Sequence, residues 1–325
     1  MRELRIGQND AGQRLDKFLT KALPSLPASL LYKSIRLKKI KRNRKRAQPQ
    51  EVLAEGDVLQ LFLAEEFFPD APGAGPDLAR VRVGLRVVYE DANILLLNKP
   101  AGVNVHEDDR GDGNTLLLHL QAYLFQKGEY DPAAENAFAP ALCNRIDRNT
   151  CGLVIAAKNA AALREMNQRI RARTVEKYYL CAVHGRPVPP EAVLEGYLCK
   201  DETTKTVRVY DSHPPRGAKP IRTGYRTLCT EGELSLLQVR LYTGRTHQIR
   251  AHLAHIGHPL LGDGKYGKNA ADRARGYDAQ ALCAYRVVFG PGEAGALSYL
   301  DGKEVRLHEE DIPFLGAFPH RPSLV

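Results

Sequence analysis

The chain carries the sequence NRIDRNTCGLVIAA at residues 144–157, where a charged, polar turn leads directly into an apolar segment. The continuous apolar residues from Leu153 to Ala157 predict a buried strand. In the turn, Asp147 stands between Arg145 and Arg148, whose positive charges favour the ionised carboxylate. An ionised carboxylate can serve as a nucleophile or as a general base. An ordinary surface turn with a local ion pair would give the same pattern, so both interpretations stay open at this point.

The segments around this turn contain more strands than helices. We expect strands at residues 85–89, 94–98, 178–184, 206–210, 234–242 and 287–289, and a helix at 159–171. The helix follows from Leu163, Met166 and Ile170, which recur at helical spacing. Because few strand–helix–strand units occur, the sequence predicts an α+β fold with a mixed, mostly antiparallel sheet.

A second motif, TGRTHQIRAH at residues 243–252, follows a predicted strand. We expect the strand to end at Gly244 and a helix to begin near Thr246, with Ile249 and Leu253 on its apolar face. A helix N-terminus with flanking Arg is a good anion site. It could bind a phosphate, or it could hold a carboxylate such as Asp147. The alternative is an ordinary amphipathic helix with basic surface residues.

The first 65 residues are strongly basic. They contain 14 Lys or Arg and 7 Asp or Glu, which supplies +7 of the chain's net charge of +9. A polyanionic partner suits this charge, either nucleic acid or an acidic membrane surface. Two helices, capped by Asp10 and Ser29, and a short strand at 58–63 predict that these residues form a small folded unit.

Nine of the fourteen residues from Lys33 to Arg46 are Lys or Arg. Such a run can be a solvated face or a flexible arm, but here it overlaps a predicted helix and turn. Tyr32 is the only aromatic residue nearby, so phosphate contacts are favoured over base stacking. The candidate RNA-binding residues are Lys33, Arg36, Lys38, Lys39, Lys41, Arg42, Arg44, Lys45 and Arg46.

We expect a small basic domain at residues 1–65, a linker with Pro and Gly at 66–85, and a larger domain at 86–325. The apolar runs are far shorter than the ~20 residues that cross a bilayer. The first ten residues lack the apolar core of a secretory signal. The sequence therefore predicts a cytoplasmic protein with no membrane partner.

Patterns for metals and cofactors are weak. Six Cys are scattered without a CxxC pair, which disfavours a zinc ribbon or a redox dithiol. The four His between residues 247 and 258 lack the HExxH spacing, and no carboxylate joins them before Asp263. The GxGxxG match at 262–267 does not follow a clear strand of a βαβ unit. We therefore expect no metal and no cofactor.

Together these motifs resemble the RluA-type family of RNA pseudouridine synthases, in particular its RluC- and RluD-like members, over nearly the whole chain. Residues 144–153 are similar to the signature loop HRLDxxTSGL, and residues 243–263 match TGRTHQIRxHxxxxGHPxxGD. Residues 89–91 and 98–106 resemble the family's opening strands, and residues 177–179 match its KxY motif. Residues 14–57 are similar to the small α/β RNA-binding domain named after ribosomal protein S-four.

The resemblance implies an isomerase that needs no cofactor and converts uridine to pseudouridine in structured RNA, after the target base has left its stack. It implies that Asp147 is the catalytic carboxylate and that Tyr179 stacks on the base and takes part in proton transfer. It also implies that Arg245 pairs with Asp147. The implied substrate-binding residues are Arg145, which helps to displace the target nucleotide, Thr150 and Leu282.

Four residues depart from the family pattern. Asn144 stands where His is usual, Ile146 where Leu is usual, and Cys151 where Ser or Thr is usual. In the small domain, Arg44 replaces a common turn Gly, so we expect the turn at Asn43 to differ.

The S-four-type domain favours large-subunit ribosomal RNA as the substrate, because it accompanies that substrate in relatives; transfer RNA is the alternative. We expect the protein to act as a monomer. The chemical route stays open between a glycal, an acylal-type adduct and addition to the pyrimidine ring. The rival functions are a non-catalytic RNA-binding protein on a synthase scaffold and a metal-dependent hydrolase that uses the His cluster.

Overall fold

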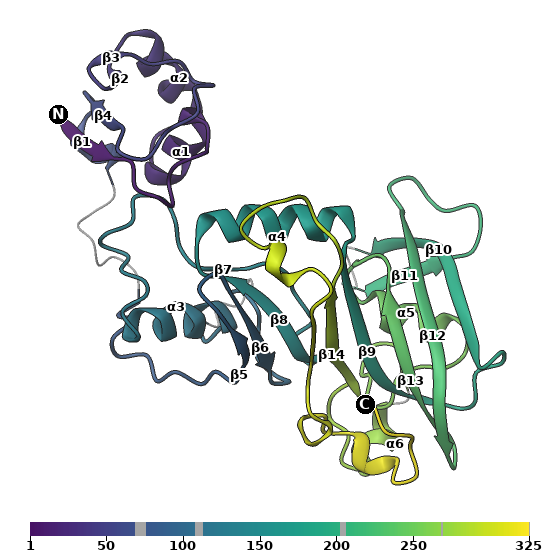
Figure 1. The fold of residues 1–325 in the computed structure, drawn as a ribbon. Helices are drawn as coiled ribbons and strands as arrows, with labels where there is room; N and C mark the ends of the chain where they lie inside the picture. Colours follow the sequence, from purple (N-terminus) through teal and green to yellow (C-terminus); the bar gives the residue numbers. More distant parts are fainter. Residues whose placement is uncertain (69–75, 108–112, 202–205, 268, 325) are drawn as a thin grey trace. The chain divides into compact units, whose positions relative to one another are not determined.

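The computed structural model describes residues 1–68, 76–107, 113–201, 206–267 and 269–324 (Figure 1). The chain divides into two compact units. The small unit comprises Met1–Gly84, Leu118–Ala141 and Ala157–Arg164, and the large unit comprises Leu85–Leu117, Leu142–Ala156 and Glu165–Val325. Of the segment expected to be a linker, residues 69–75 lie outside the described residues. The boundaries expected at 65 and 86 therefore stay a prediction.

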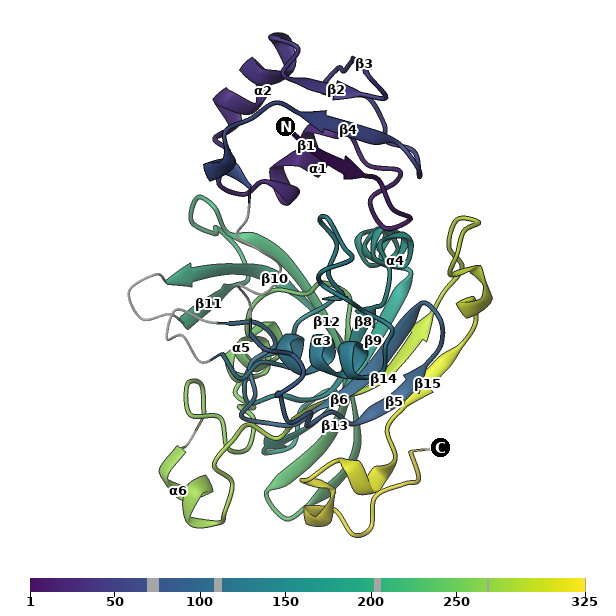
Figure 2. The same ribbon diagram turned by 90° about the vertical axis from the view of Figure 1, so that its left-hand side faces the viewer.

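The small unit is built on a four-stranded antiparallel sheet with helices packed on it (Figure 2). The strand order is β1-β4-β2-β3 among the described residues. The bounds are Arg2–Arg5 for β1, Ile40–Arg42 for β2, Lys45–Arg46 for β3, Val58–Leu61 for β4, Leu15–Ala22 for α1 and Ala28–Arg36 for α2.

Helices α1 and α2 each bury one apolar stripe. In α1, Leu15, Phe18 and Leu19 are fully covered, because spacings of three and four residues place them on one face. They pack against strand residues such as Leu59 in a single apolar cluster. The opposite face of α2 carries the exposed Lys33 and other basic residues, so the burial pattern leaves the positive charge outside.

The expected helix caps are wrong. Helix α1 follows Arg14 and α2 follows Pro27, and neither helix has a side-chain cap. Asp10 lies before the first helix, where it accepts hydrogen bonds from the Gly7 amide and the Asn136 side chain. Ser29 lies inside α2 instead of preceding it.

The turn between β2 and β3 keeps the left-handed geometry of a two-residue hairpin in spite of Arg44. Asn43 has φ 51° and Arg44 has φ 65°, as a type I′ turn requires at both central residues. Contacts hold the turn: Asn43 Nδ2 donates to Asp57, and the Arg44 amide donates to the Gln60 side chain. The expectation of a different turn is therefore wrong, because these contacts offset the cost of a side chain at positive φ.

The strands of the large unit belong to an eleven-stranded sheet, counted over the described residues. Its order is β11-β10-β12-β13-β9-β14-β8-β6-β5, with β15 beside β14 and β7 beside β8. Pairs with a described register are antiparallel, except the parallel pair β8–β14. This confirms the predicted mixed, mostly antiparallel sheet. The bounds are β5 Val87–Glu90, β6 Ile94–Lys99, β7 Ala141–Leu142, β8 Cys151–Ala157, β9 Val175–His184, β10 Glu191–Asp201, β11 Thr206–Tyr210, β12 Lys219–Glu231, β13 Leu234–Leu241, β14 Leu282–Phe289 and β15 Glu304–Arg306.

Four α-helices are described after the small sheet. They are α3 Leu116–Gln126, α4 Ala160–Ala172, α5 Gln248–His255 and α6 Asn269–Ala274. The predicted helix at 159–171 is confirmed as α4, whereas α3 and the strands β10 and β12 were not predicted. No helix in the described ranges is both long and apolar enough to span a bilayer.

The parallel contact between β8 and β14 depends on a glycine. Gly152, the second residue of β8, pairs with Ala284 of β14 and adopts φ 109°. A Cβ atom at this position would collide with the backbone of Ala284. Because the turn that carries Asp147 leads directly into β8, this close approach fixes where the turn ends.

Gly152→Ala should therefore destabilise the protein more than Gly102→Ala. Gly102 also has a positive φ, 88°, but a Cβ there meets nothing within 4 Å. Gly102→Ala should lower the free energy of unfolding by about 1 kcal/mol, because it adds backbone strain alone. The collision at position 152 should lower the free energy of unfolding by at least ~2 kcal/mol more. Chemical denaturation gives both losses. Equal losses would show that the approach to Ala284 does not require glycine.

Candidate active site

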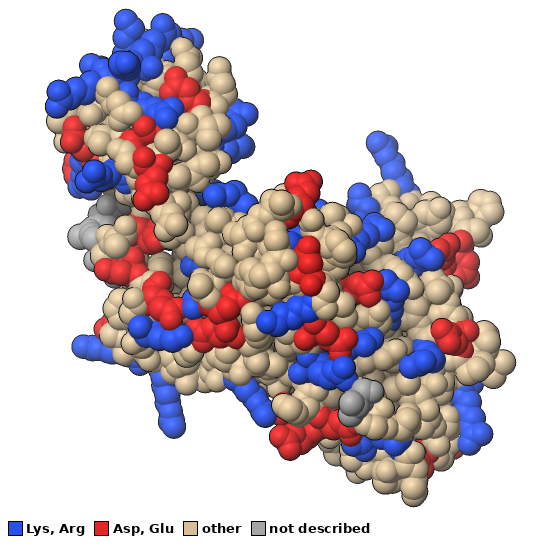
Figure 3. All heavy atoms as spheres, viewed as in Figure 1, with Lys and Arg blue, Asp and Glu red and all other residues tan. Residues whose placement is uncertain are grey.

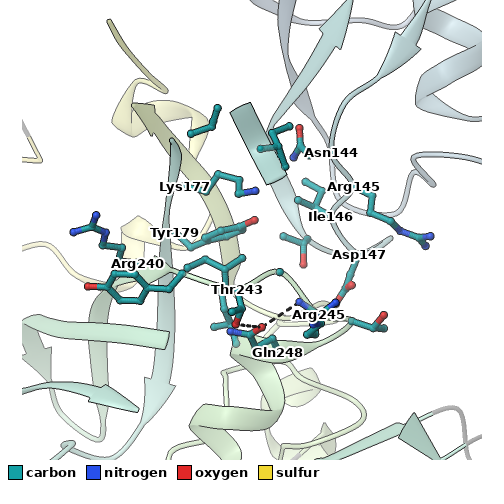
Figure 4. Close-up of a pocket in the computed structure, with 18 of the residues that line it drawn as sticks. Asn144, Arg145, Ile146, Asp147, Lys177, Tyr179, Arg240, Thr243, Arg245 and Gln248 are labelled. Atoms are coloured by element: carbon teal, nitrogen blue, oxygen red, sulfur yellow. Dashed lines mark hydrogen bonds between the residues drawn. The ribbon is translucent and has the colours of Figure 1, made fainter. Parts of the chain in front are cut away.

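A pocket of about 760 Å³ in the large unit brings the sequence motifs together (Figure 4). The turn 143–147, the start of β9 and the segment 240–250 line it, and Leu282 at the start of β14 adds an apolar surface. A cavity of this size suits a nucleotide-sized ligand. The three segments lie far apart in the sequence and meet because β9, β13 and β14 are neighbours in the sheet.

Arg250 on the first turn of α5 holds the carboxylate of Asp147. Its Nη1 donates to Asp147 Oδ2 at 3.0 Å, while Nε and Nη2 each donate to Asp263 at 2.8 Å. The Asp263 side chain is fully buried and that of Arg250 is 7% exposed. Burial alone would raise the pKa of Asp263, but the hydrogen bonds and charge of Arg250 keep it below its ordinary value. The three side chains therefore form a charged network that shields Asp263 from water.

The expected pair between Arg245 and Asp147 is not formed. Helix α5 begins at Gln248, two residues later than predicted, because His247 adopts a left-handed conformation with φ 54°. Arg245 consequently lies in the turn before the helix, where its side chain is exposed on the pocket wall. The arginine that faces the carboxylate is Arg250, five residues further along the same motif.

The two groups expected to act on the base both have atoms open to the pocket. Asp147 Oδ1 accepts no hydrogen bond from a described residue, and the Tyr179 hydroxyl has no partner among them either. A polar atom without a partner is either fully covered or accessible, and neither of these two atoms is fully covered. Both are therefore accessible from the pocket. Burial and the charge of Asp147 raise the pKa of Tyr179, so the phenol keeps its proton. The pocket thus offers a carboxylate oxygen and a neutral phenol.

A buried lysine fixes the turn that carries Asp147. Lys99 at the end of β6 is fully buried, and its amine donates to the carbonyls of Pro100, Val103 and Arg148, each at 2.8 Å. Burial lowers the pKa of Lys99 to about 8, which leaves it charged at neutral pH. An ammonium group has three N–H donors for these three carbonyls. The lysine therefore ties the residue after Asp147 to the loop that follows β6.

Gln248 and His247 fix the start of α5. The Gln248 amide nitrogen donates to the Arg222 carbonyl and to Thr223, and its oxygen accepts from the Arg245 amide. His247 shares a hydrogen bond with Tyr266, and its other ring nitrogen lies 3.9 Å from Asp147 Oδ2. Burial lowers the pKa of His247.

The three residues expected to bind substrate all line the pocket. Arg145 is exposed, Leu282 is buried, and Thr150 is buried with its hydroxyl accepting from Gln280. The Thr150 amide also donates to the Asp147 carbonyl, which closes the turn. Thr150 therefore supports the turn from within the protein.

The His cluster does not converge. His252 shares a hydrogen bond with Thr223, whereas His255 contacts Asp211. Within the described part of the chain, no group of three or more His, Cys, Asp or Glu could hold a metal ion.

In the small unit, basic side chains gather around α2 and the β2–β3 hairpin (Figure 3). Arg42 differs from its neighbours because it forms ion pairs with Asp57 at 2.6 Å and with Glu51 at 3.7 Å. Lys41 is half-buried over the Phe62 ring. The exposed members of the predicted set are Lys33, Arg36, Lys38, Lys39, Arg44, Lys45 and Arg46.

Comparison with known proteins bears on this site. Residues 93–255 match the family model described as RNA pseudouridylate synthase. The chain is 35% identical over 275 residues to the ribosomal large subunit pseudouridine synthase C of Vibrio cholerae, covering 82% of this chain and 81% of that protein. It is 34% identical over 270 residues to the protein of the same name from Vibrio vulnificus, covering 82% and 80%. Human RNA pseudouridylate synthase domain containing 1 shares the fold, with a TM-score of 0.53 at 22% identity over 74% of this chain and 98% of that chain.

A carboxylate held by a buried arginine, beside a neutral phenol in a cationic pocket, is the kind of site that suits an enzyme with an anionic substrate. The chain belongs to the RNA pseudouridylate synthase family. It is therefore an isomerase that converts uridine to pseudouridine in RNA.

Asp263→Asn should destabilise the protein in a pH-dependent way. Loss of one charge from a buried ion pair costs about 3 kcal/mol or more. Because the folded pKa of Asp263 is lowered, its contribution is present above the ordinary value of 3.8 and is lost as the pH falls through the folded value. The difference in unfolding free energy between wild type and variant should therefore shrink below about pH 4.

Denaturation curves across acidic pH measure this difference, with the exposed residue Glu191 as a matched control in the variant Glu191→Gln. A constant difference between wild type and Asp263→Asn would contradict the stabilisation of the charged form by Arg250.

Proposed function

We propose that the protein isomerises specific uridines in large-subunit ribosomal RNA and that Asp147 is its catalytic carboxylate. The names of the Vibrio relatives support this substrate class. The observation that carries the proposal is that the two carboxylate oxygens of Asp147 have different environments. Oδ2 is held by Arg250, and Oδ1 is open to the pocket. The carboxylate is thus fixed in orientation and still available to a nucleotide.

The isomerisation breaks the bond between N1 of uracil and C1′ of ribose and forms a bond from C5 to the same carbon. The proton leaves C5 and a proton is taken up at N1, so the reaction is balanced without a second substrate. In the proposal, the Asp147 carboxylate assists detachment of the base, and Arg250 stabilises the negative charge on Asp147 before and after that step. Tyr179 forms an aromatic wall and donates its hydroxyl proton in a hydrogen bond.

The target base has to leave its stack before it can reach Asp147. Arg145 is exposed at the pocket and has no ion pair with a described residue, so it is available to occupy the space the nucleotide leaves. Leu282 offers an apolar surface for the uracil ring. Arg245, on the same pocket, is assigned to RNA contact, because Arg250 already pairs with Asp147.

We further propose that residues 1–65 form the RNA-binding domain of a cytoplasmic monomer. Its exposed Lys and Arg side chains would contact phosphates, which positions the enzyme on structured RNA by shape and charge. Arg42 is the exception, because Asp57 and Glu51 already neutralise it.

Asp147→Asn should abolish pseudouridine formation in unmodified large-subunit ribosomal RNA, a loss of at least ~10³-fold in kcat, because the amide cannot replace the carboxylate. Affinity for the RNA should change by less than about twofold, because most RNA contacts are phosphate contacts elsewhere. Mass spectrometry of digested RNA detects the product.

The control for this experiment is Asp211→Asn, which removes an exposed carboxylate outside the pocket. Retained turnover in Asp147→Asn would overturn the role of Asp147. Tight binding by the wild type without product in ribosomal or transfer RNA would instead favour a non-catalytic RNA-binding protein.

Neutralising the exposed Lys38, Lys39 and Lys45 to Gln should weaken RNA binding and lower the salt slope. Each lost phosphate contact lowers the slope of log K against log salt by about 0.7 to 0.9. Arg42→Gln is the matched control, since its charge is already paired, and it should leave the slope nearly unchanged. Binding titrations at several salt concentrations compare the variants. An unchanged slope in the triple variant would place the RNA contacts on another surface.

A further inference from the structure

The active-site pocket carries a large excess of positive charge. Two carboxylates line it, and both are already paired: Asp147 with Arg250, and Glu176 with Arg240. Eight Lys and Arg side chains line the same pocket within the described residues. They are Arg145, Arg171, Arg173, Lys177, Arg222, Arg240, Arg245 and Arg250. Arg222 also pairs with Glu195 and Arg250 with Asp263, both outside the pocket lining. The positive charge that remains suits a ligand that carries negative charge.

The unpaired cations come from two parts of the chain. Arg145 and Arg245 belong to the two motifs next to Asp147. A second group, Arg171, Arg173 and Lys177, lies at the end of α4 and the start of β9. None of these three side chains forms an ion pair or hydrogen bond with a described residue. The proposed roles of the catalytic residues do not involve the second group.

Lys177 is the most informative of the three. It is half-buried on the strand that carries Tyr179, two positions earlier, so both side chains leave the strand on the same face. Figure 4 shows the Lys177 amine and the Tyr179 ring side by side in the pocket. Among the described residues the amine has no partner, and it is not one of the fully covered polar atoms, so it is open to the pocket. A desolvated cation without an acceptor is costly for the folded protein, which indicates a role in binding.

Two more cations, at the end of α4, line the same pocket as Lys177. The helix ends at Ala172, and Arg173 then adopts φ 63°, a conformation that usually favours glycine at this position. Arg171 and Arg173 are both exposed on the pocket lining. Guanidinium groups bind phosphate with two parallel hydrogen bonds, and an ammonium group adds a point charge.

We propose that Lys177, Arg171 and Arg173 form a binding site for a backbone phosphate adjacent to the target uridine. This inference rests on the proposed function, because it places the uracil beside Asp147 and Tyr179. The site fixes the ribose–phosphate of the extruded nucleotide in the pocket that holds Asp147 and Tyr179. Lys177 is a positioning residue here, since it contacts the backbone and not the reacting atoms.

Lys177→Gln tests the site with a large-subunit ribosomal RNA transcript. The variant should raise KM about tenfold, the value of one charge-assisted hydrogen bond, with kcat within about threefold of the wild type. Its salt slope should fall by about 0.7, as for one phosphate on a single strand. Lys177→Arg should restore most of the affinity because it retains the charge.

Lys219→Gln is the matched control. Lys219 is an exposed strand lysine of the large unit outside the pocket lining. Lys219→Gln shows how much RNA affinity falls when one positive charge is removed from the protein surface outside the pocket. Equal effects of Lys177→Gln and Lys219→Gln would overturn the proposed site.

Competition with small probes locates the phosphate. Uridine 3′,5′-bisphosphate should inhibit the wild type at least about tenfold better than uridine, and Lys177→Gln should remove that advantage. Uridine 5′-monophosphate and 3′-monophosphate then show which of the two phosphates occupies the site. No advantage of the bisphosphate over uridine in the wild type would contradict the proposal.

Lys177→Met separates binding from folding. If Lys177 serves RNA, removal of its desolvated charge should leave the melting temperature unchanged or raise it, while affinity falls. A lowered melting temperature with unchanged affinity would show a structural role instead.

If the wild type forms no pseudouridine in any RNA, the proposed function fails, whereas direct titration with the bisphosphate still decides whether the phosphate site exists.

Discussion

The structure of the site depends on how one buried guanidinium divides its donors. Nε and Nη2 of Arg250 donate hydrogen bonds to Asp263, and Nη1 donates to Asp147. Asp263 lies 13 residues after Arg250 and Asp147 lies 103 residues before it, so this one side chain ties the loop after α5 and the distant turn before β8 to the helix. A buried cation with two carboxylates is stable only when both are in place. The position of Asp147 is therefore set by the fold of the large unit as a whole.

Two further buried polar side chains, Lys99 and Gln248, also fix the segments that carry Asp147 and Arg250. Lys99 holds the Arg148 carbonyl, so the turn is fixed just after Asp147. Gln248 ties the start of α5 to β12 through Thr223 and the Arg222 carbonyl. Polar groups of this kind cost free energy to bury unless every donor and acceptor is satisfied. Within the described residues, Asp147 Oδ1 and the Tyr179 hydroxyl are left without a partner and stay accessible from the pocket.

Much of the site could be predicted from the sequence, since the motifs of residues 144–153, 177–179 and 243–263 do meet in one pocket. The partner of Asp147 could not. The choice between Arg245 and Arg250 depends on where α5 begins, and a left-handed residue at His247 delays that start. Local patterns do not encode this, because the contacts of Gln248 that set the helix start are with Thr223 and Arg222, which lie 25 and 26 residues away in the sequence.

Similar limits explain the other differences. Strand β12 was missed because its apolar residues are interrupted by charges such as Arg222 and Arg226, which face out from the sheet. The cap predicted at Asp10 is wrong because Asp10 finds its partners in Gly7 and in Asn136, far along the chain. The cap predicted at Ser29 is wrong because α2 already begins at Ala28, after Pro27. Lys177 matched a motif, but its lack of an acceptor became visible only once the neighbouring strands were in place.

The most direct test of this account compares turnover by Arg250→Lys and Arg245→Lys on the same ribosomal RNA transcript, with KM and kcat measured separately. Lysine keeps the charge but cannot bridge two carboxylates in a planar fork. The account predicts that Arg250→Lys lowers kcat by about 10² or more, whereas Arg245→Lys changes kcat less than about threefold. The opposite order, with kcat lost in Arg245→Lys and retained in Arg250→Lys, would contradict it.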